Sequence, residues 1–172
     1  MKYITAYNRD WPERFVQITA YVKAFLPAGC AFHHIGSTSV PGMPAKDIID
    51  LDIEYANGFL QAVIDGLKKA GYKHAGDLGV PGRDAFKPVP DSGAANLPAH
   101  HLYACEADAY ELQKHLAYRD YLRAHPARSE WLANEKLLAD ASANSRDEYI
   151  DKKSGYYELI TKESMEWANK SK

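Results

Sequence analysis

The sequence predicts an α/β (α+β) domain in which one mixed sheet has helices packed against it. Two observations predict this class. Strand-like and helical segments alternate over about residues 1–107, and helical periodicity alone continues over about residues 108–170. The chain has 172 residues, of which 46% are hydrophobic and 26% charged, as is typical of globular domains. We therefore expect a single domain over residues 1–172, with a mixed α/β core followed by a helical extension.

The first helix is expected to begin after Asp10 and to end before Pro27. Asp10 and Glu13 form a capping-box pattern. Apolar residues then recur at steps of three and four over residues 11–25, which gives the helix one apolar face.

Five short segments predict the strands of the sheet. The clearest covers residues 48–55, where Ile49, Leu51 and Ile53 would face one side and acidic residues the other. Gly- and Pro-rich turns separate the remaining strand-like segments from one another. These segments cover residues 31–35, 72–75, 85–89 and 101–105.

Caps and apolar stripes predict the remaining helices. Asn57 is expected to cap a helix that carries apolar residues over 60–67 and stops at Gly71. Three more helices are expected in the second part of the chain. Capping-box patterns predict that the first of them begins after Asp108 and the third after Ser145, and Pro126 begins the second.

Charge and cysteine content exclude several classes of protein. The 21 Lys and Arg residues against 23 Asp and Glu give a formal net charge of −2, whereas proteins that coat nucleic acid or anionic membranes usually carry a basic excess. No apolar run approaches the ~20 residues that span a bilayer, and the first ten residues lack the apolar core of a signal peptide. Cys30 and Cys105 are too few for a disulfide scaffold or a four-cysteine zinc site. We expect a cytoplasmic protein without a membrane or nucleic-acid partner.

A turn rich in small hydroxyl residues follows the strand over 31–35. Gly36, Ser37 and Thr38 could aim backbone N–H groups and hydroxyls at one point, as phosphate binding requires. The turn is not a P-loop, because Pro41 stands where that motif needs its second glycine. Turns of this composition often have no ligand, so both interpretations stay open for this segment alone.

Asp50 and Asp52, the acidic pair, form a second candidate for a binding site. Residues i and i+2 of a strand point to the same face, which holds the two carboxylates close together. Such a pair repels unless a cation or a proton lies between the groups, and Mg²⁺ is bound by one or two carboxylates together with phosphate oxygens. The alternative is a solvated strand face with alternating acids.

A strand, a Gly-Ser turn and Asp-x-Asp on the next strand together resemble the nucleotidyltransferase superfamily, which includes DNA polymerase β and the aminoglycoside nucleotidyltransferases. More closely, the chain resembles the GrpB family within that superfamily, over roughly residues 5–168. The matching segments are residues 34–42, 45–46, 48–52, 82–83, 86–87, 100–102, 118–126 and 135–139, with Tyr149 and Lys153.

The resemblance implies a minimal nucleotidyltransferase fold with a C-terminal helical extension. It implies that Gly36 and Ser37 cradle the terminal phosphates of a nucleoside triphosphate, and that Asp50 and Asp52 hold Mg²⁺ or Mn²⁺. Active relatives usually have a third carboxylate on a later strand. The corresponding strand here reads His-His-Leu-Tyr and holds no acid before Glu106. His101 is therefore the candidate base for the acceptor hydroxyl, with Glu54 as the alternative.

Basic side chains complete the predicted site. In a functional site these side chains would neutralise the charge on a triphosphate or on an anionic acceptor. Alternatively, they form salt bridges within the fold, and we favour this role for Arg119 with Asp120. The candidates are Lys46, Arg83, Lys87, Arg119, Arg123 and Lys136.

Two functions stay open at this stage. The first is a metal-dependent nucleotidyltransferase that moves a nucleoside monophosphate from an NTP to a small-molecule acceptor and releases pyrophosphate. The second is a nucleotide- or phosphate-binding module without turnover that accompanies another enzyme. GrpB-like domains fused to dephospho-CoA kinase connect the second function with coenzyme A metabolism. A third acidic group within reach of Asp50 and Asp52 would favour the enzyme.

Overall fold

The computed structural model describes residues 2–170. In chain order its helices and strands are α1 (Trp11–Lys23), β1 (Ala31–Ile35), β2 (Ile49–Tyr55), α2 (Leu60–Lys69), β3 (Tyr72–His74), β4 (Asp84–Pro88), β5 (His100–Glu106), α3 (Tyr110–Ala124), α4 (Pro126–Ser142) and α5 (Arg146–Lys170). A single turn of 3₁₀ helix, η1 (Ser37–Ser39), follows β1, and η2 (Gly93–Asn96) precedes β5. None of the described helices is long and apolar enough to cross a membrane.

The strands form one mixed sheet in the order β1-β2-β5-β4-β3. The central strands β2 and β5 are parallel, and the other neighbouring pairs are antiparallel. The register aligns Asp50 with Ile35 on one side and with His101 on the other, and it aligns Asp52 with Tyr103. Residues directly opposite one another share a face of the sheet, so the acidic pair, His101 and Tyr103 lie on the same face.

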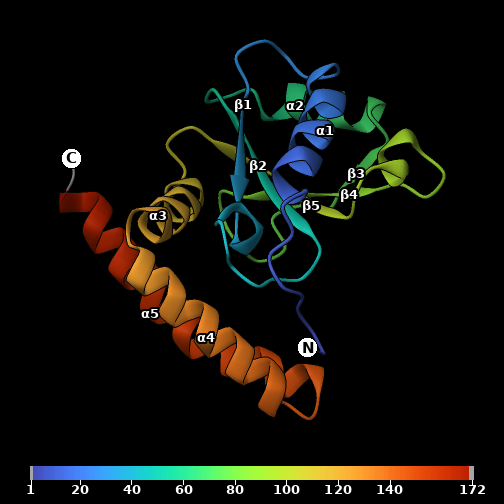
Figure 1. Cartoon of the computed structure of the whole chain (residues 1–172). Helices are drawn as coiled ribbons and strands as arrows, with labels where there is room; N and C mark the ends of the chain where they lie inside the picture. The colour runs from blue at the N-terminus through green and yellow to red at the C-terminus, as the bar shows by residue number, and fades with distance from the viewer. Residues whose placement is uncertain (1, 171–172) are drawn as a thin grey trace.

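Helices cover both faces of the sheet (Figure 1). On one face α1 and α2 pack apolar side chains, among them Trp11, Ile18 and Leu67, against Leu51 and Ile53 of β2. The opposite face is covered by α3, which leaves Asp52 with none of its surface exposed. Asp52 is therefore an interior residue, whereas the side chains of Asp50 and Glu54 on the same face stay about one third exposed.

The last two helices form a long antiparallel pair that runs beside the sheet domain (Figure 1). A second apolar cluster joins them to α3, to the segment after η1 and to the N-terminal segment, with Val40, Met43, Leu132, Tyr149 and Ile160 among its buried members. The helical extension thus packs on the loop that follows β1.

Three of the four predicted capping residues do not cap. Asp10 has helical backbone angles and its side chain makes no capping bond. Asn57 and Asp108 instead bond to each other across the ends of β2 and β5, at 3.2 Å, and their helices begin at Leu60 and Tyr110. A capping pattern in the sequence does not reveal this competing tertiary bond.

The fourth capping residue is confirmed. The backbone N–H of Glu148 donates to Ser145 Oγ at 3.1 Å, at the start of α5. The Glu148 carboxylate accepts from the backbone N–H of Asn144, one residue earlier than a standard capping box would place it.

A buried carboxylate fixes the N-terminal segment to the helical extension. Asp140 on α4 is 2% exposed and accepts from the backbone N–H groups of Lys2, Tyr3 and Ile4 at 2.8, 2.6 and 3.2 Å. Burial raises the pKa of Asp140, but these hydrogen bonds outweigh it and the net pKa is lowered.

We predict that Asp140→Ala lowers the free energy of unfolding by about 1–3 kcal/mol, because it leaves buried N–H groups without their acceptor. The difference from the wild type should be largest above the ordinary aspartate pKa. It should shrink as the pH falls below about 4, because the carboxyl of the unfolded chain then takes up a proton that the folded carboxyl, with its lowered pKa, still lacks. Urea unfolding at pH 7 and pH 3.5 measures both. Asp151→Ala, at an exposed position of α5, serves as the control, and equal destabilisation by the two variants would contradict the assignment.

Candidate functional site

Gly36 lets the turn after β1 approach the acidic strand. Its φ of +67° lies in the region that favours glycine. A Cβ on Gly36 would lie 2.6 Å from Asp50 Oδ2, which is closer than two such atoms can approach. A side chain at this position would therefore force apart the turn and the Asp50 carboxylate.

Each carboxylate of the acidic pair is bonded to a histidine. Asp50 Oδ1 lies 2.8 Å from Nδ1 of His101 on β5, and Asp52 Oδ2 lies 2.7 Å from Nδ1 of His115 on α3. Within residues 2–170, the buried Oδ1 of Asp52 has no hydrogen-bond partner. A fully buried carboxylate oxygen without a partner is unfavourable by about 1–3 kcal/mol, and such an atom indicates a place for an ion or a ligand.

Among residues 2–170, neither of the candidate acids Glu54 and Glu106 joins this pair as the third carboxylate of active nucleotidyltransferases. Glu54 pairs with His33 at 2.7 Å, and Glu106 accepts from the backbone N–H of Gly58 at 3.2 Å. Tyr103 stands opposite Asp52 in the register of β2 and β5. In the described part of the chain, no group of three or more His, Cys, Asp or Glu side chains is arranged to hold a metal ion.

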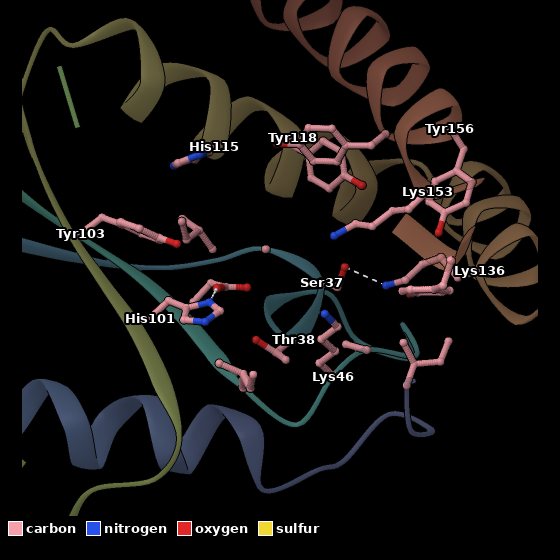
Figure 2. Close-up of a pocket in the computed structure, with 18 of the residues that line it drawn as sticks. Ser37, Thr38, Lys46, His101, Tyr103, His115, Tyr118, Lys136, Lys153 and Tyr156 are labelled. Carbon is pink, nitrogen blue, oxygen red and sulfur yellow. Dashed lines mark hydrogen bonds and ion pairs between the residues drawn. The ribbon is translucent and has the colours of Figure 1, made fainter. Parts of the chain in front are cut away.

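A cavity of about 330 Å³ lies between the sheet and the helical extension. In Figure 2, Lys136, Lys153 and Ser37 lie at one end of it, and Tyr103 and His115 lie at the other, with His101 on the Tyr103 side. The acidic strand, the Gly-Ser turn and all three long helices contribute to its wall. Its lining residues include Gly36, Ser37, Thr38, Lys46, Asp50, Arg83, His101, Tyr103, His115, Lys136 and Lys153, with the tyrosines at 118, 149, 156 and 157.

Three lysines give the first end of the cavity an excess of positive charge. Lys136 on α4 is 3% exposed, and its Nζ donates to Ser37 Oγ at 2.7 Å. Burial, and secondarily the charge of Lys153, lowers the pKa of Lys136 to about 7. Burial also lowers the pKa of Lys46, followed by the charges of Arg146 and Lys153. As far as the structure describes the chain, Lys46, Lys136 and Lys153 form no ion pair with a carboxylate.

Three predicted basic residues do not line the cavity. Lys87 is exposed on β4. Arg119 is paired with Asp120 at 2.7 Å and donates to the carbonyl of His34, in agreement with the structural alternative. Arg123 donates twice to the Ser39 carbonyl, at 3.0 and 2.7 Å. The two arginines of α3 therefore hydrogen-bond to the backbone at the two ends of the Gly-Ser turn.

Sequence reasoning missed two polar residues of the cavity as site residues. Lys153 belongs to a segment that matches the GrpB family, and that match was the available signal. His115 lies one helical turn before Arg119, but only the tertiary contact of α3 with β2 reveals its bond to Asp52. The tyrosines at 118, 156 and 157 pack within the extension and also form one wall of the cavity.

The model of a family described as GrpB protein matches residues 3–163. The chain belongs to the GrpB family. The UPF0157 protein YqkA of Bacillus subtilis is 35% identical over 167 residues, which cover 95% of this chain and 47% of YqkA. The glutamate-rich protein GrpB of Alkalihalophilus pseudofirmus is 31% identical over 93% of this chain and 94% of its own length. This member of the family thus spans about half the length of YqkA and nearly the full length of the second relative.

Solved structures confirm the expected fold. The crystal structure of conserved protein GrpB from Enterococcus faecalis has a TM-score of 0.79 and 31% identity, over 96% of this chain and 98% of that one. The Cid1 poly(U) polymerase, in a structure with MgGTP bound, has a TM-score of 0.53 at 12% identity, over 80% of this chain and 43% of Cid1. At that identity the likeness shows the fold alone, which is nucleotidyltransferase-like.

The acidic pair fits one hard cation that completes its shell with other ligands. Asp50 Oδ2 and Asp52 Oδ1 take no part in the bonds to histidine, and Mg²⁺ commonly uses one or two carboxylates and fills its remaining positions with phosphate oxygens and water. The unpartnered, buried Oδ1 of Asp52 is the observation that supports this fit.

We predict that Lys136 makes the stability of the free protein rise with pH between about 7 and 10.5. Folded Lys136 binds its proton more weakly than an ordinary lysine of pKa 10.5, so unfolding takes up a proton in this window and higher pH favours the folded state. Relative to Lys136→Met, the wild type should gain up to roughly 1.4 kcal/mol of unfolding free energy per pH unit.

Denaturant unfolding of the wild type and of Lys136→Met at pH 7.5 and 9.5 tests this prediction. Comparison with Lys68→Met, an exposed lysine of α2, removes the general effect of losing a positive charge. A pH-independent difference between the wild type and Lys136→Met would show that Lys136 is not held in an unfavourable charged state.

Proposed function

We propose that the cavity binds the triphosphate of an NTP and that the protein is a metal-dependent nucleotidyltransferase acting on a small-molecule acceptor. The observation that carries the proposal is the proximity of two features. Lysines without carboxylate partners line the cavity around Ser37, together with Asp50. Asp52, two residues further along β2, lies behind this wall and retains a buried, unpartnered oxygen. A polyanion with its cation would satisfy both features.

The lysine end suits the terminal phosphates. Ser37 and Thr38 offer hydroxyls, and the turn at Gly36 brings backbone close to the ligand. Burial disfavours the charged forms of Lys136 and Lys46 and so lowers the pKa of both side chains. A bound phosphate would stabilise these charged forms. Lys153 adds a third positive charge at the same end.

Asp50 and Asp52 are the residues that would hold Mg²⁺ or Mn²⁺ together with the phosphates. A cation bound there supplies neutralisation of the charge that builds up on the phosphorus and its oxygens during transfer. The carboxylates in turn lie beside the turn that carries Ser37, because Gly36 and Asp50 are in contact. Phosphate and cation sites would thus share the end of the sheet where β1 ends and β2 begins.

In the proposed reaction His101 takes the acceptor proton. Its Nδ1 bonds to Asp50, which leaves Nε2 as the ring nitrogen that can accept a proton, and the side chain is half exposed. In the proposed reaction the acceptor oxygen bonds to the α-phosphorus while the bond from that phosphorus to the bridging oxygen of pyrophosphate breaks. The hydroxyl proton passes to His101, and pyrophosphate leaves toward the lysines.

A binding module without turnover is the second candidate function. The observation that favours it is the replacement of the third carboxylate by Tyr103 and histidines, since a tyrosine is a poor base near neutral pH. In such a module the same cavity would hold a nucleotide or another polyphosphate for a partner enzyme.

Calorimetric titration with each NTP, with and without Mg²⁺ or Mn²⁺, tests the site. We predict metal-dependent binding by the wild type and a loss of at least about 100-fold in Asp50→Asn/Asp52→Asn, because both charged ligands are removed. Asp65→Asn, at an exposed position of α2, should bind as the wild type does. No binding of any NTP by a folded wild type would refute the proposal. Pyrophosphate release in the presence of acceptors then separates the enzyme from the binding module.

We further predict that NTP affinity falls as the pH rises from 7.5 to 9. A bound anion raises the pKa of Lys136 above its value of about 7 in the free protein, so binding takes up a proton. The affinity should fall by up to about tenfold per pH unit, and the heat of binding should vary with the ionisation enthalpy of the buffer. Lys136→Met should bind weakly and with much less pH dependence. An affinity that rises over this range would contradict the role of Lys136.

A further inference from the structure

Among the described residues that line the cavity, Arg83 is the arginine that lies beside Tyr103 at the second end, away from the three lysines. It lies just before β4, and the register places it on the face of Tyr103, since Ala85 is paired with Tyr103. Its guanidinium carbon lies 4.3 Å from the centre of the Tyr103 ring. The guanidinium thus lies over the ring of Tyr103, which stands opposite Asp52 where the third carboxylate of active relatives is expected.

The charge of Arg83 is not neutralised by the protein. Throughout residues 2–170 it forms no ion pair within 4.0 Å, and its Nε is buried without a hydrogen-bond partner. A buried donor of this kind is unfavourable. An arginine with only a structural role usually donates to carboxylates or carbonyls, as Arg119 and Arg123 do. Arg83 is therefore prepared for an anion that comes from outside the chain.

Arg83 and the lysines belong to opposite ends of the site. The rings of Tyr103 and His101 are 6.4 Å apart, and Figure 2 shows both on the side of the cavity away from Lys136 and Lys153. In phosphoryl transfer the attacking and leaving oxygens are roughly in line. If pyrophosphate leaves toward the lysines, the acceptor enters from the side of His101 and Tyr103, where Arg83 lies.

We infer that the acceptor is a small anion that also carries a hydroxyl group, and that Arg83, supported by the Tyr103 ring, binds its carboxylate or phosphate. This inference rests on the proposed nucleotidyl transfer and adds the substrate class to it. The anionic group bonds to Arg83 and directs the hydroxyl toward His101 Nε2. The hydroxyl oxygen then bonds to the α-phosphorus, its proton passes to His101, and pyrophosphate departs, which gives an acceptor that carries the nucleoside monophosphate.

Binding of matched probes to the complex with Mg²⁺ and a non-hydrolysable NTP tests the inference. The probes are glycerol 3-phosphate, glycerate and glycerol, which share hydroxyl groups and differ in charge. Occupation of the lysine end by the NTP analogue keeps the probes from binding there. We expect both anions to bind at least about tenfold more tightly than glycerol, and a preference between them identifies the anionic group as phosphate or carboxylate.

Two substitutions of Arg83 connect this binding to the proposed contact. Arg83→Ala should weaken the anionic probes by about tenfold or more and leave glycerol unchanged, and Arg83→Lys should lose part of the effect, because it keeps the charge without the planar fork. Arg9→Ala, at an exposed arginine outside the lining of the cavity, should bind all probes as the wild type does. Binding of the NTP analogue itself should be unaffected by Arg83→Ala.

The outcomes separate this inference from the function on which it rests. If the wild type binds the NTP analogue but binds the anions no better than glycerol, or if Arg83→Ala binds them as the wild type does, the acceptor class is wrong and the nucleotide site stands. If the wild type binds no NTP analogue, the proposed function and the acceptor class fail together.

Discussion

The site depends on one close approach, that of the Gly36 backbone to the Asp50 carboxylate. Any residue with a Cβ at position 36 would separate the turn from the acidic strand. The antiparallel register of β1 and β2 sets this contact, and the parallel pairing of β2 with β5 adds His101 at the same level. The Gly-Ser turn, the acidic pair and His101 thus lie at the same end of neighbouring strands of one sheet, which is the arrangement that the proposed transfer requires.

The helical extension closes this edge into a cavity and adds charge to it. Lys136 reaches the Ser37 hydroxyl from α4 while almost wholly buried. Burial of a lysine amine without a carboxylate is unfavourable for stability. A bound ligand of opposite charge can compensate for such a group, and the proposed polyanion would do so in this cavity. The unpartnered Oδ1 of Asp52 is the corresponding unfavourable group of opposite sign.

Local sequence patterns predict most of the fold and half of the site. The five strands lie within two residues of their predicted bounds because alternation and turn residues are local signals. The prediction that Asn57 and Asp108 cap helices was wrong, because their side chains hydrogen-bond to each other across the ends of β2 and β5. The pairing of His115 with Asp52, and the separation of Lys87 from the cavity, follow from how α3 and β4 pack on the sheet, and no local pattern encodes that packing.

The most direct test of the account is a crystal structure of the protein with a non-hydrolysable NTP and Mn²⁺, whose anomalous scattering locates the ion. The account predicts Mn²⁺ between Asp50 and Asp52, and the terminal phosphate on Ser37 and Lys136. A nucleotide bound elsewhere, or phosphates at Ser37 with no ion at the acidic pair, would contradict it. The second of these results would leave a phosphate-binding domain in which the carboxylates serve only the fold.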